Sequence, residues 1–366
     1  MRLALLSTSD TDLLSARASG ADWIWGNPTR GIPDLTDADL IVVRLLGSPH
    51  DLEPWRDEFF TGDRPVVVVG GEVQPNAELM ALSTVPIGMA AEAHRYLAEG
   101  GPANLRQLHA FLSDTVLLTG EGFEPPAVVP AWGLARRAGG FETGASAPSS
   151  TTDKVVEVRS QASLEVTSLE TTAAPPRIGV LYYRAHEISG NAGFAHALAD
   201  AIDATGKAVG VPVFAGSLRS APDELYDALG TLDALIVTVL AAGGSKPAGA
   251  SAGGDDEAWD VERLRALDIP VLQGLCLTTS REEWEASDDG VTPLDSATQI
   301  AIPEFDGRII TAPFSFKEID PDDPAALPRY VADPERCARV AGIAVNHARL
   351  RHIPNSEKRI ALMLSA

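Results

Sequence analysis

The distribution of apolar residues predicts a chain built from repeated strand-and-helix units. Three short apolar runs, at residues 2–7, 177–182 and 359–364, each begin with an arginine and continue with β-prone residues. Continuous runs of this length, bounded by polar residues, are typical of strands that are buried on both faces of a parallel sheet. The pattern therefore predicts the first strands of three α/β units. Because few residues follow the third run, we expect its unit to continue in a larger protein.

The first unit is predicted to alternate strands with helices and to end in helices. Strands are expected over residues 3–7, 40–46 and 65–69, and helices near residues 11–18 and 52–60. A longer helical section follows over residues 88–98 and 104–118. Gly100-Gly101-Pro102 divides this section, since glycine and proline mark helix ends and starts. We assign residues 1–138 to an N-terminal α/β domain with a helical end.

The second unit alternates more regularly. Strands are predicted over residues 178–183, 211–215, 234–240 and 271–275, and helices over residues 191–205, 222–229, 257–267 and 281–286. Strands and helices that alternate at this spacing form a parallel sheet with right-handed crossovers. The predicted fold class is multi-domain α/β, with flavodoxin-like or Rossmann-like parallel sheets flanked by helices. Residues 177–353 are assigned to the second domain and residues 354–366 to the start of a further one.

The segment between the two units, residues 139–176, has a different composition. It is rich in Ser, Thr, Ala and Pro, and its apolar residues are sparse and aperiodic apart from residues 155–158. Such a segment buries too little surface to offset its chain entropy. We expect it to be a flexible linker or insertion.

Composition and charge exclude several classes of protein. The 366 residues are 45% apolar and 22% charged, which is the ordinary globular mix and excludes a wholly disordered chain. A formal charge of −22 repels nucleic acids and anionic membrane surfaces. The two cysteines form no disulfide framework, and no apolar run is long enough for a signal peptide or a membrane span. We expect a cytoplasmic protein that binds neither nucleic acid nor membrane.

The first candidate site is the loop that follows the strand at residues 178–183. Within nine residues it gathers a cation, an imidazole, a carboxylate, a hydroxyl and an amide, from Arg184, His186, Glu187, Ser189 and Asn191. Ligands of open α/β sheets bind at the carboxyl ends of the strands, and helix N-termini attract anions. The alternative is that Ser189 or Asn191 caps the next helix while Arg184 and His186 are solvated.

The second candidate is the glycine-rich loop at residues 241–256, which follows another strand at the same predicted sheet edge. Gly243 and Gly244 permit close approach of a ligand to the backbone, and Lys246 adds a cation. The loop is no Walker A motif, and no such motif occurs elsewhere in the chain. A loop at the edge of the site, with an aspartate capping the next helix, explains the same residues without ligand contact.

Metal-ligand spacing is poor. His347 and His352 do not share a helical face, and neither cysteine has a ligand partner nearby in the sequence. We therefore expect no permanent structural metal. A basic strip over residues 337–359 is typical of a solvated helix or a domain contact, although a substrate with several carboxylates would also fit it.

Several strings of the sequence, taken in order, resemble one family. In the first unit these are Arg44-Leu45-Leu46-Gly47, residues 81–86 and residues 96–104. In the second unit they are Tyr183-Arg184-Ala185-His186, Ser189-Gly190-Asn191, residues 271–274, residues 303–308 and residues 354–359. Together they resemble the N-terminal part of the large subunit of aerobic cobaltochelatase, the CobN family, with the magnesium chelatase H subunit as a more distant relative.

The resemblance implies a ligase activity. Large subunits of this family bind the tetrapyrrole, and the family inserts Co²⁺ into hydrogenobyrinic acid a,c-diamide in cobalamin biosynthesis. ATP is hydrolysed by two ATPase-associated partner subunits, which agrees with the missing Walker A motif. Family members are much longer than 366 residues. We therefore expect this chain alone to be inactive.

Metal insertion removes two pyrrolic protons, so a neutral imidazole or a carboxylate near the ring is required. His186 is the candidate base or metal relay, with Glu187 or Glu304 as its carboxylate partner, and Arg184 could pair with a substrate carboxylate. Ser189, Asn191, Gly243, Gly244 and Lys246 are the other candidate substrate contacts. Glu304 has an alternative explanation, because Pro303 and Asp306-Gly307 are typical of a turn between strands.

A second hypothesis from another class remains open. The chain would then be a non-catalytic α/β scaffold that docks the partner ATPase subunits and closes over a site built by later domains. Binding of a tetrapyrrole by the chain itself would separate the two hypotheses.

Overall fold

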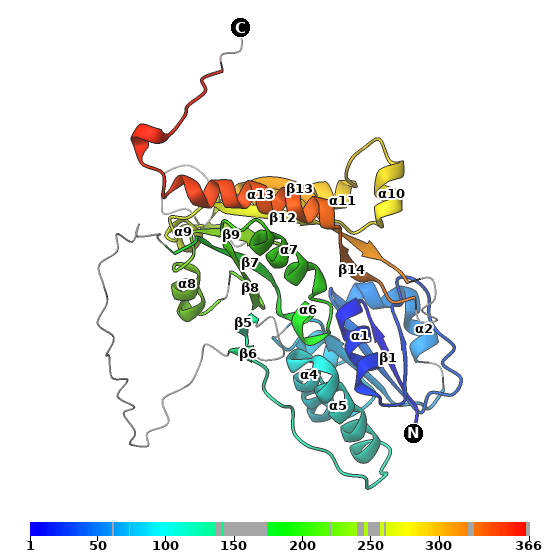
Figure 1. The fold of residues 1–366 in the computed structure, drawn as a ribbon. Helices are drawn as coiled ribbons and strands as arrows, with labels where there is room; N and C mark the ends of the chain where they lie inside the picture. Colours follow the sequence, from blue (N-terminus) through cyan, green and yellow to red (C-terminus); the bar gives the residue numbers. More distant parts are fainter. Residues whose placement is uncertain are drawn as a thin grey trace, which may run out of the picture.

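Two α/β units make up the chain in a computed structural model (Figure 1). The structure describes residues 1–60, 62–72, 74–135, 141–142, 174–219, 221–239, 245–247, 257–259, 261–320 and 326–363. Most of the predicted linker at residues 139–176 lies outside these ranges, so its flexibility stays a prediction. The predicted α/β class, with parallel sheets flanked by helices, is confirmed.

The first unit is built on a four-stranded parallel sheet of order β2-β1-β3-β4. Its strands are β1 (Leu3–Ser7), β2 (Trp23–Gly26), β3 (Leu40–Leu45) and β4 (Val66–Gly70). Every residue of β1, β3 and β4 is buried, as the continuous apolar runs predicted. The strand β2 was not predicted, because it has only four residues and most of them are half-buried.

Helices cover both faces of this first sheet. One face carries α1 (Asp10–Ser19), α4 (Ile87–Glu99) and α5 (Gly101–Thr115). The other carries the 3₁₀ helix η1 (Pro49–Trp55), α2 (Arg56–Phe59) and α3 (Ala77–Met80). The helices bury Leu13, Leu97 and Leu108 on the first face and Leu52, Phe59 and Leu79 on the second. This double coverage explains why the strands show no alternation of polar residues.

The second unit contains an eight-stranded sheet of order β14-β13-β12-β9-β7-β8-β5-β6. Its parallel strands are β7 (Arg177–Tyr183), β8 (Val209–Ala215), β9 (Ala234–Val237), β12 (Val271–Cys276) and β13 (Ile309–Glu318). The antiparallel edges are β14 (Arg329–Ala332), β5 (Trp132–Ala135) and β6 (Phe141–Glu142). Counted from β7, the parallel strands have the flavodoxin-like order 2-1-3-4-5.

The strand β5 changes the first domain boundary. It pairs with β8 of the second sheet, so the chain enters the second unit before residue 138, where the sequence placed the end of the first. A second correction concerns residues 257–259, which were predicted as the start of a helix. They form β11 (Glu257–Trp259), paired with β10 (Ser245–Pro247), and the helix α9 (Glu262–Arg265) begins only afterwards.

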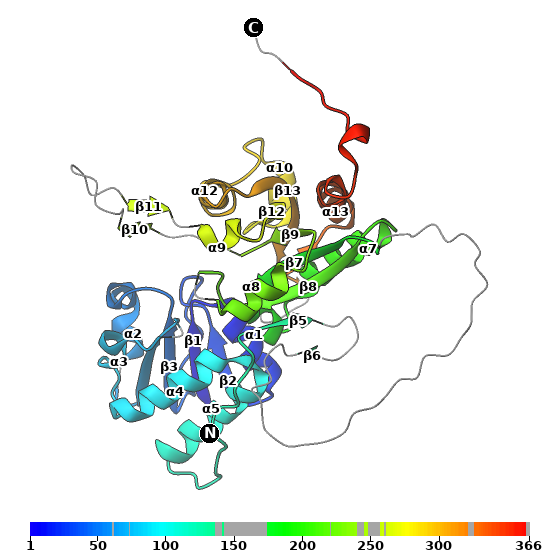
Figure 2. The ribbon, with the colours of Figure 1, turned by 90° about the vertical axis from the view of Figure 1, so that its left-hand side faces the viewer.

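Helices also cover both faces of the second sheet, as Figure 2 shows. One face carries α7 (Gly193–Ala204) and α13 (Pro334–Leu350), and the other carries α8 (Asp223–Leu229) and α9. The remaining helical segments are α6 (Arg184–Ile188), α10 (Arg281–Ala286), α11 (Pro293–Asp295), the π-helix η2 (Ser296–Ala301), α12 (Ile302–Phe305) and η3 (Asn355–Glu357). The basic strip over residues 337–359 therefore begins on a helix whose other face is core.

The two units are in contact. Leu327, from the second unit, is buried in the hydrophobic cluster of the first, and Ile188 lies against Gly100. Beyond α13 the chain extends away from both units, with Ile360, Leu362 and Met363 exposed (Figure 1). None of the helices that the structure describes is long and apolar enough to span a membrane.

Candidate functional site

A cavity of about 760 Å³ lies between the two units. We call it the inter-unit cavity and define it by the segments that end the strands around it. The first unit contributes Ser9 after β1, Leu46 after β3 and Gly71 after β4. The second unit contributes Tyr183 at the end of β7 together with Gly216–Arg219 after β8 and Val239 after β9. The carboxyl ends of both parallel sheets therefore face one cavity.

The strand order identifies this edge as the place where a ligand is expected. In an open α/β sheet, ligands bind at the point where the order of the strands reverses. That point lies between β1 and β3 in the first sheet and between β7 and β9 in the second. Both points open onto the inter-unit cavity, so the fold places the expected ligand sites of its two sheets together.

The wall of the cavity is largely apolar, with a few polar groups. Apolar side chains come from both units, among them Leu97, Ile188, Leu218 and Ile302. Polar side chains are contributed by Thr11, Ser15, Ser217 and Thr298, as well as by charged residues described below. An apolar wall with a small number of placed polar groups is typical of sites for small organic molecules.

Arg44 and Asp12 form a buried ion pair in the cavity wall. The Arg44 Nη1 lies 2.7 Å from Asp12 Oδ1, and the same guanidinium donates to the carbonyl oxygens of Leu97 and Gly71. Ser7 donates to the second oxygen of Asp12 at 2.6 Å. Arg44 was singled out in the sequence only as part of a family string, and its pair with Asp12 was not predicted. The available signal was an arginine inside an otherwise apolar strand, which requires a buried partner.

Arg184 lies at the first residue of α6 and lines the cavity. Its guanidinium donates to the carbonyl oxygens of Ala98, Val129 and Pro130, and to both the carbonyl and the carboxylate of Glu99. All three of its nitrogens are thus used within the chain. Pairing of Arg184 with a substrate carboxylate stays a prediction, and the contacts observed here connect the two units instead.

His186 differs from the solvated loop residue that the sequence allowed. It lies on α6, and its ring meets Phe194 and Tyr330 edge-on at centroid distances of 5.4 and 5.3 Å. Burial, with a smaller effect of the Lys317 charge, lowers its pKa to about 4, so the imidazole is neutral at pH 7. A neutral imidazole is the form that accepts a proton. His186 is not among the residues that line the cavity, and its role as base or metal relay stays a prediction.

Glu187 is held by two partners on its own unit. Tyr182 donates to its carboxylate at 2.6 Å, and His196 Nε2 lies 3.8 Å away. Burial would raise the pKa of Glu187, but the hydrogen bonds from His196 and Tyr182 and the His196 charge outweigh burial and lower it. The carboxylate is therefore ionised near neutral pH, with Tyr182 of β7 and His196 of α7 as its partners.

Ser189 and Asn191, the other candidates of this segment, are buried. The Ser189 hydroxyl donates to the His186 carbonyl at 3.3 Å. The Asn191 Oδ1 accepts from the backbone N–H of Tyr330 at 3.0 Å, and its Nδ2 lies 3.5 Å from His186 Nδ1. Neither residue caps α7, whose N-terminus has no side-chain cap. Asn191 instead connects the segment after α6 to the edge strand β14, and the substrate contacts of both residues stay predictions.

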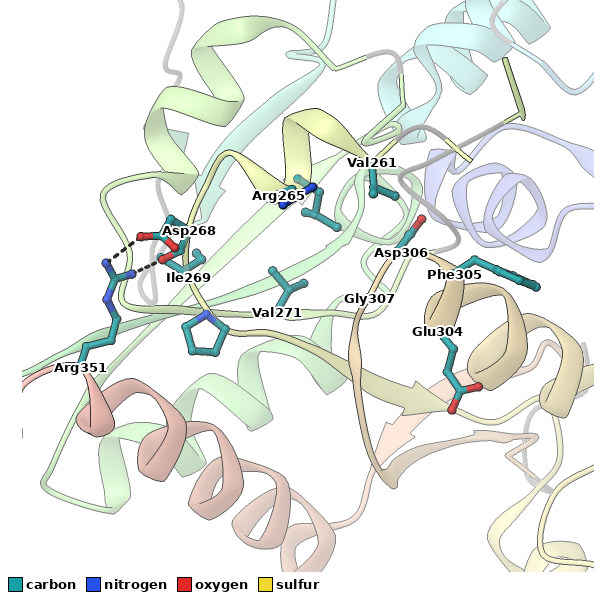
Figure 3. Close-up of a pocket in the computed structure, with 12 residues that line it drawn as sticks. Val261, Arg265, Asp268, Ile269, Val271, Glu304, Phe305, Asp306, Gly307 and Arg351 are labelled. Carbon is teal, nitrogen blue, oxygen red and sulfur yellow. Dashed lines mark hydrogen bonds and ion pairs between the residues drawn. The ribbon is translucent and has the colours of Figure 1, made fainter. Parts of the chain in front are cut away.

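Glu304 is not brought together with the other candidates. It is exposed on α12, at a separate groove of about 620 Å³ that also includes the first residue of β12, at the amino-terminal edge of that strand. Figure 3 shows Glu304 and Phe305 on one side of this groove and the Arg351–Asp268 pair on the other. The predicted turn between strands is instead the end of a helix, in which Gly307 has a φ of 74°.

The remaining candidates belong to the glycine-rich loop. Gly243 and Gly244 lie outside the described residues, and of Lys246 only the backbone, in β10, is described. Their predicted substrate contacts are therefore unchanged by the structure. In the part of the chain that is described, no cluster of three His, Cys, Asp or Glu side chains could hold a metal ion.

We predict that His186 makes the stability of the protein dependent on pH. An unfolded histidine titrates near 6.5, whereas folded His186 resists protonation until about pH 4. Between these values the unfolded chain binds the proton that the folded chain does not, so the free energy of unfolding should fall as pH falls from 6.5 to 4. Urea unfolding measured at several pH values in this range should show a smaller fall in the free energy of unfolding for His186→Gln than for the unmodified chain. His94 and His109, whose pKa values are also lowered by burial, act in both proteins alike.

The matched control for this experiment is His50→Gln, because His50 is exposed. Its pH dependence should equal that of the unmodified chain. If the free energy of unfolding fell equally with pH in the unmodified chain, His186→Gln and His50→Gln, the folded environment of His186 would not resist protonation.

Comparison with known proteins gives the family. The family described as CobN/Magnesium Chelatase matches residues 94–366. The chain is 30% identical over 340 residues to an aerobic cobaltochelatase subunit CobN from Sinorhizobium sp, and 29% identical over 306 residues to one from Pseudomonas aeruginosa. These matches cover 90% and 82% of this chain but only 25% and 22% of the relatives. The chain thus spans about a quarter of their length.

A magnesium chelatase and a solved structure extend the comparison. The magnesium chelatase H subunit from Rhodobacter capsulatus is 30% identical over 200 residues, or 51% of this chain and 16% of that protein. The solved structure is the catalytic subunit of cobaltochelatase from Mycobacterium tuberculosis, with 49% sequence identity and a TM-score of 0.67. It is matched over 98% of this chain and 28% of its own length. This chain therefore belongs to the CobN/magnesium chelatase family.

Proposed function

We propose that this chain forms the N-terminal part of the tetrapyrrole-binding large subunit of an ATP-dependent cobaltochelatase. The reaction is the insertion of Co²⁺ into hydrogenobyrinic acid a,c-diamide during cobalamin biosynthesis, in the cytoplasm. The family membership and the relatives named as cobaltochelatase subunits support the reaction type. Cobalt is a substrate of this reaction, so a resident metal site is not required of the chain.

The inter-unit cavity is the observation that carries the proposal for this part of the subunit. A tetrapyrrole has an apolar ring and a polar periphery, and the cavity wall is apolar with polar groups at intervals. Its volume of about 760 Å³ is within the range of sites that enclose organic ligands of this size. We therefore propose that the macrocycle, or a large part of it, lies between α1 and α6.

The proposed chemistry uses α6. As the metal enters, two pyrrolic protons must leave the ring, and neutral His186 is the proposed acceptor or relay. Arg184, Ala185 and Ile188 of the same helix line the cavity, so a ligand there would contact α6 directly. Glu187 is the proposed carboxylate partner, because it is ionised and follows His186 on α6. Glu304 would need a different ligand pose, since it belongs to the separate groove.

ATP is proposed to be hydrolysed by two ATPase-associated partner subunits rather than by this chain. The sequence has no Walker A motif with which to hold the phosphates. Hydrolysis in the partners would then drive cobalt insertion through contacts with the large subunit.

A cobalt-incorporation assay tests the proposed activity. The chain should not insert cobalt when it is mixed with hydrogenobyrinic acid a,c-diamide, Co²⁺ and ATP, because no subunit present hydrolyses ATP. A complete large subunit supplied with the ATPase subunits should insert it, which the corrinoid absorbance reports, and His186→Gln in that subunit should slow insertion. Cobalt insertion by the chain with ATP alone would contradict the proposed division of labour.

A specific observation favours a second candidate, the non-catalytic scaffold. Arg184, Glu187, Ser189 and Asn191 all make hydrogen bonds within the chain, as structural residues do. A scaffold that docks the ATPase subunits would bind those subunits but no tetrapyrrole. Binding of the ATPases by a chain that does not bind the macrocycle would support this candidate.

A further inference from the structure

The relative position of the two units is fixed by contacts at two ends of the inter-unit cavity. At one end Arg184, on α6 of the second unit, reaches the end of α4 in the first. Its Nε donates to Pro130 at 2.9 Å, its Nη1 to Ala98 at 3.2 Å, and its Nη2 to both the carbonyl and the carboxylate of Glu99, at 2.9 and 3.1 Å. The side chain is only 14% exposed. Its contacts with neighbouring segments therefore lie largely out of water.

The carboxylate of Glu99 joins three segments. The same oxygen that accepts from Arg184 also accepts from the backbone N–H of Val129, at 2.9 Å. The carbonyl of Val129 in turn accepts from Arg184 at 3.1 Å. Helix α4, the segment leading to β5 and helix α6 are thus linked through one guanidinium. The planar fork of arginine can reach these acceptors at once, whereas the single ammonium of lysine cannot.

Glycine permits the close approach that this arrangement needs. Gly100 follows Glu99 and has a φ of 68°, a conformation that side-chain-bearing residues rarely adopt. A Cβ at this position would come within 2.7 Å of Ile188 Cδ1. The glycine between α4 and α5 therefore lets α6 pack directly against the first unit.

At the other end of the cavity, an ion pair and a buried apolar side chain connect the two units. Lys317 of β13 lies 2.6 Å from Asp10, at the start of α1, and Arg30 lies 2.5 Å from the other oxygen of the same carboxylate. Leu327 is buried in the core of the first unit. Because residues next to Asp10 and next to Glu99 line the cavity, these contacts fix its walls at both ends.

We propose that Arg184 is a positioning residue that sets the width of the inter-unit cavity by holding α6 against the end of α4. Its cation acts on Glu99 and on main-chain carbonyls and does not pair with a carboxylate of the substrate. The inference has two parts. The ligand half, the effect of Arg184 on tetrapyrrole binding, rests on the proposed function. The structural half, the fixed relative position of the two units, is independent of the proposed function.

The structural half is tested with spin labels on cysteines introduced at His50 in the first unit and Glu282 in the second, both exposed. The native cysteines, Cys276 and Cys337, are buried. Electron–electron distance measurements should give a narrow distribution for the labelled parent. Arg184→Lys should widen it, and Glu99→Gln should widen it less, because an amide oxygen can still accept. Arg95→Lys, on the exposed face of α4, is the control and should leave it narrow.

The ligand half is tested by titrating the same variants with two tetrapyrroles, one carrying free carboxylates and one fully amidated. Arg184→Lys should weaken the binding of both by roughly 10- to 100-fold, because misplacing a wall of the site affects every ligand in it. The loss should be the same at low and at high salt. Arg95→Lys should bind both tetrapyrroles as the parent does.

The outcomes separate the possibilities. If Arg184→Lys weakened binding of only the tetrapyrrole with free carboxylates, and high salt removed this difference in affinity, the proposal would be overturned. Arg184 would then contact a carboxylate of the substrate directly. A narrow distance distribution in Arg184→Lys would overturn it whatever the titrations show, and if that variant does not fold, the same result for Glu99→Gln would overturn it. A parent chain that binds neither tetrapyrrole would refute the proposed function, while the distance measurements would still decide the positioning role.

Discussion

Replacement of Asp306 by alanine is expected to lower the free energy of unfolding by about 3–5 kcal/mol, the usual cost of breaking a buried ion pair from one side. The side chains of Asp306 and Arg308 are both 0% exposed, and Arg308 Nη2 lies 2.6 Å from Asp306 Oδ2. Burial lowers the pKa of Arg308, although Asp306 opposes this effect. Without the carboxylate the guanidinium would lose this charged partner and would still donate to the carbonyl of Val239 and the amide oxygen of Gln273.

Urea unfolding of the whole chain measures this effect, and an exposed ion pair gives the matched control. Asp223 pairs with Arg263 at 2.7 Å, and its side chain is 94% exposed. Exposed pairs contribute at most about 1 kcal/mol, so Asp223→Ala should change the unfolding free energy little. Equal effects of the two substitutions would show that the Asp306–Arg308 pair is not buried as described.

Filling the inter-unit cavity should abolish most tetrapyrrole binding. Ser217 lines the cavity on the loop after β8 and is only partly buried, so a tryptophan there can extend into the cavity without replacing core residues. We expect Ser217→Trp to weaken tetrapyrrole binding at least about tenfold, equivalent to about 1.4 kcal/mol. Fluorescence or absorbance titration measures the dissociation constant.

The control for this substitution is Ser287→Trp. The two serines make the same local contact: Ser217 Oγ accepts from the N–H of Arg219 and Ser287 Oγ from that of Asp289, both at 3.2 Å. Ser287 is exposed at the end of α10 and does not line the cavity. The Ser287→Trp variant should therefore bind tetrapyrrole as the unmodified chain does. Unaltered binding by Ser217→Trp would place the macrocycle outside the cavity.

The main strands of both sheets could be predicted from the sequence, because a strand buried on both faces is a short, continuous apolar run. The runs that became β1 and β7 are continuous and apolar, and both proved to be interior strands of parallel sheets. Prediction was poorer where tertiary contacts decide the structure. Residues 184–188 contain three polar side chains and suggested a loop, yet they form a helix held by Arg184 against the first unit.

The sheet edge at which Arg184 lies was predicted from the sequence, but the residues that Arg184 and Arg44 contact were not. The carboxyl edge of the second sheet follows from strand and helix alternation, and it does border the inter-unit cavity. The partner of Arg184, however, is Glu99, which lies 85 residues earlier, and Arg44 pairs with Asp12 across 32 residues. No spacing rule connects such residues, because they meet only when the two units pack together, as for Arg184 and Glu99, or when a helix packs against a strand, as for Asp12 of α1 and Arg44 of β3.

A crystal structure of the chain with a bound tetrapyrrole is the most direct test of the central claim, that the carboxyl ends of the two sheets form one site for the macrocycle. We predict that the ring lies in the inter-unit cavity, between α1 and α6, in contact with Ser217 and Ile302. A ring bound elsewhere, for example in the groove beside Glu304 and Phe305, would contradict this account.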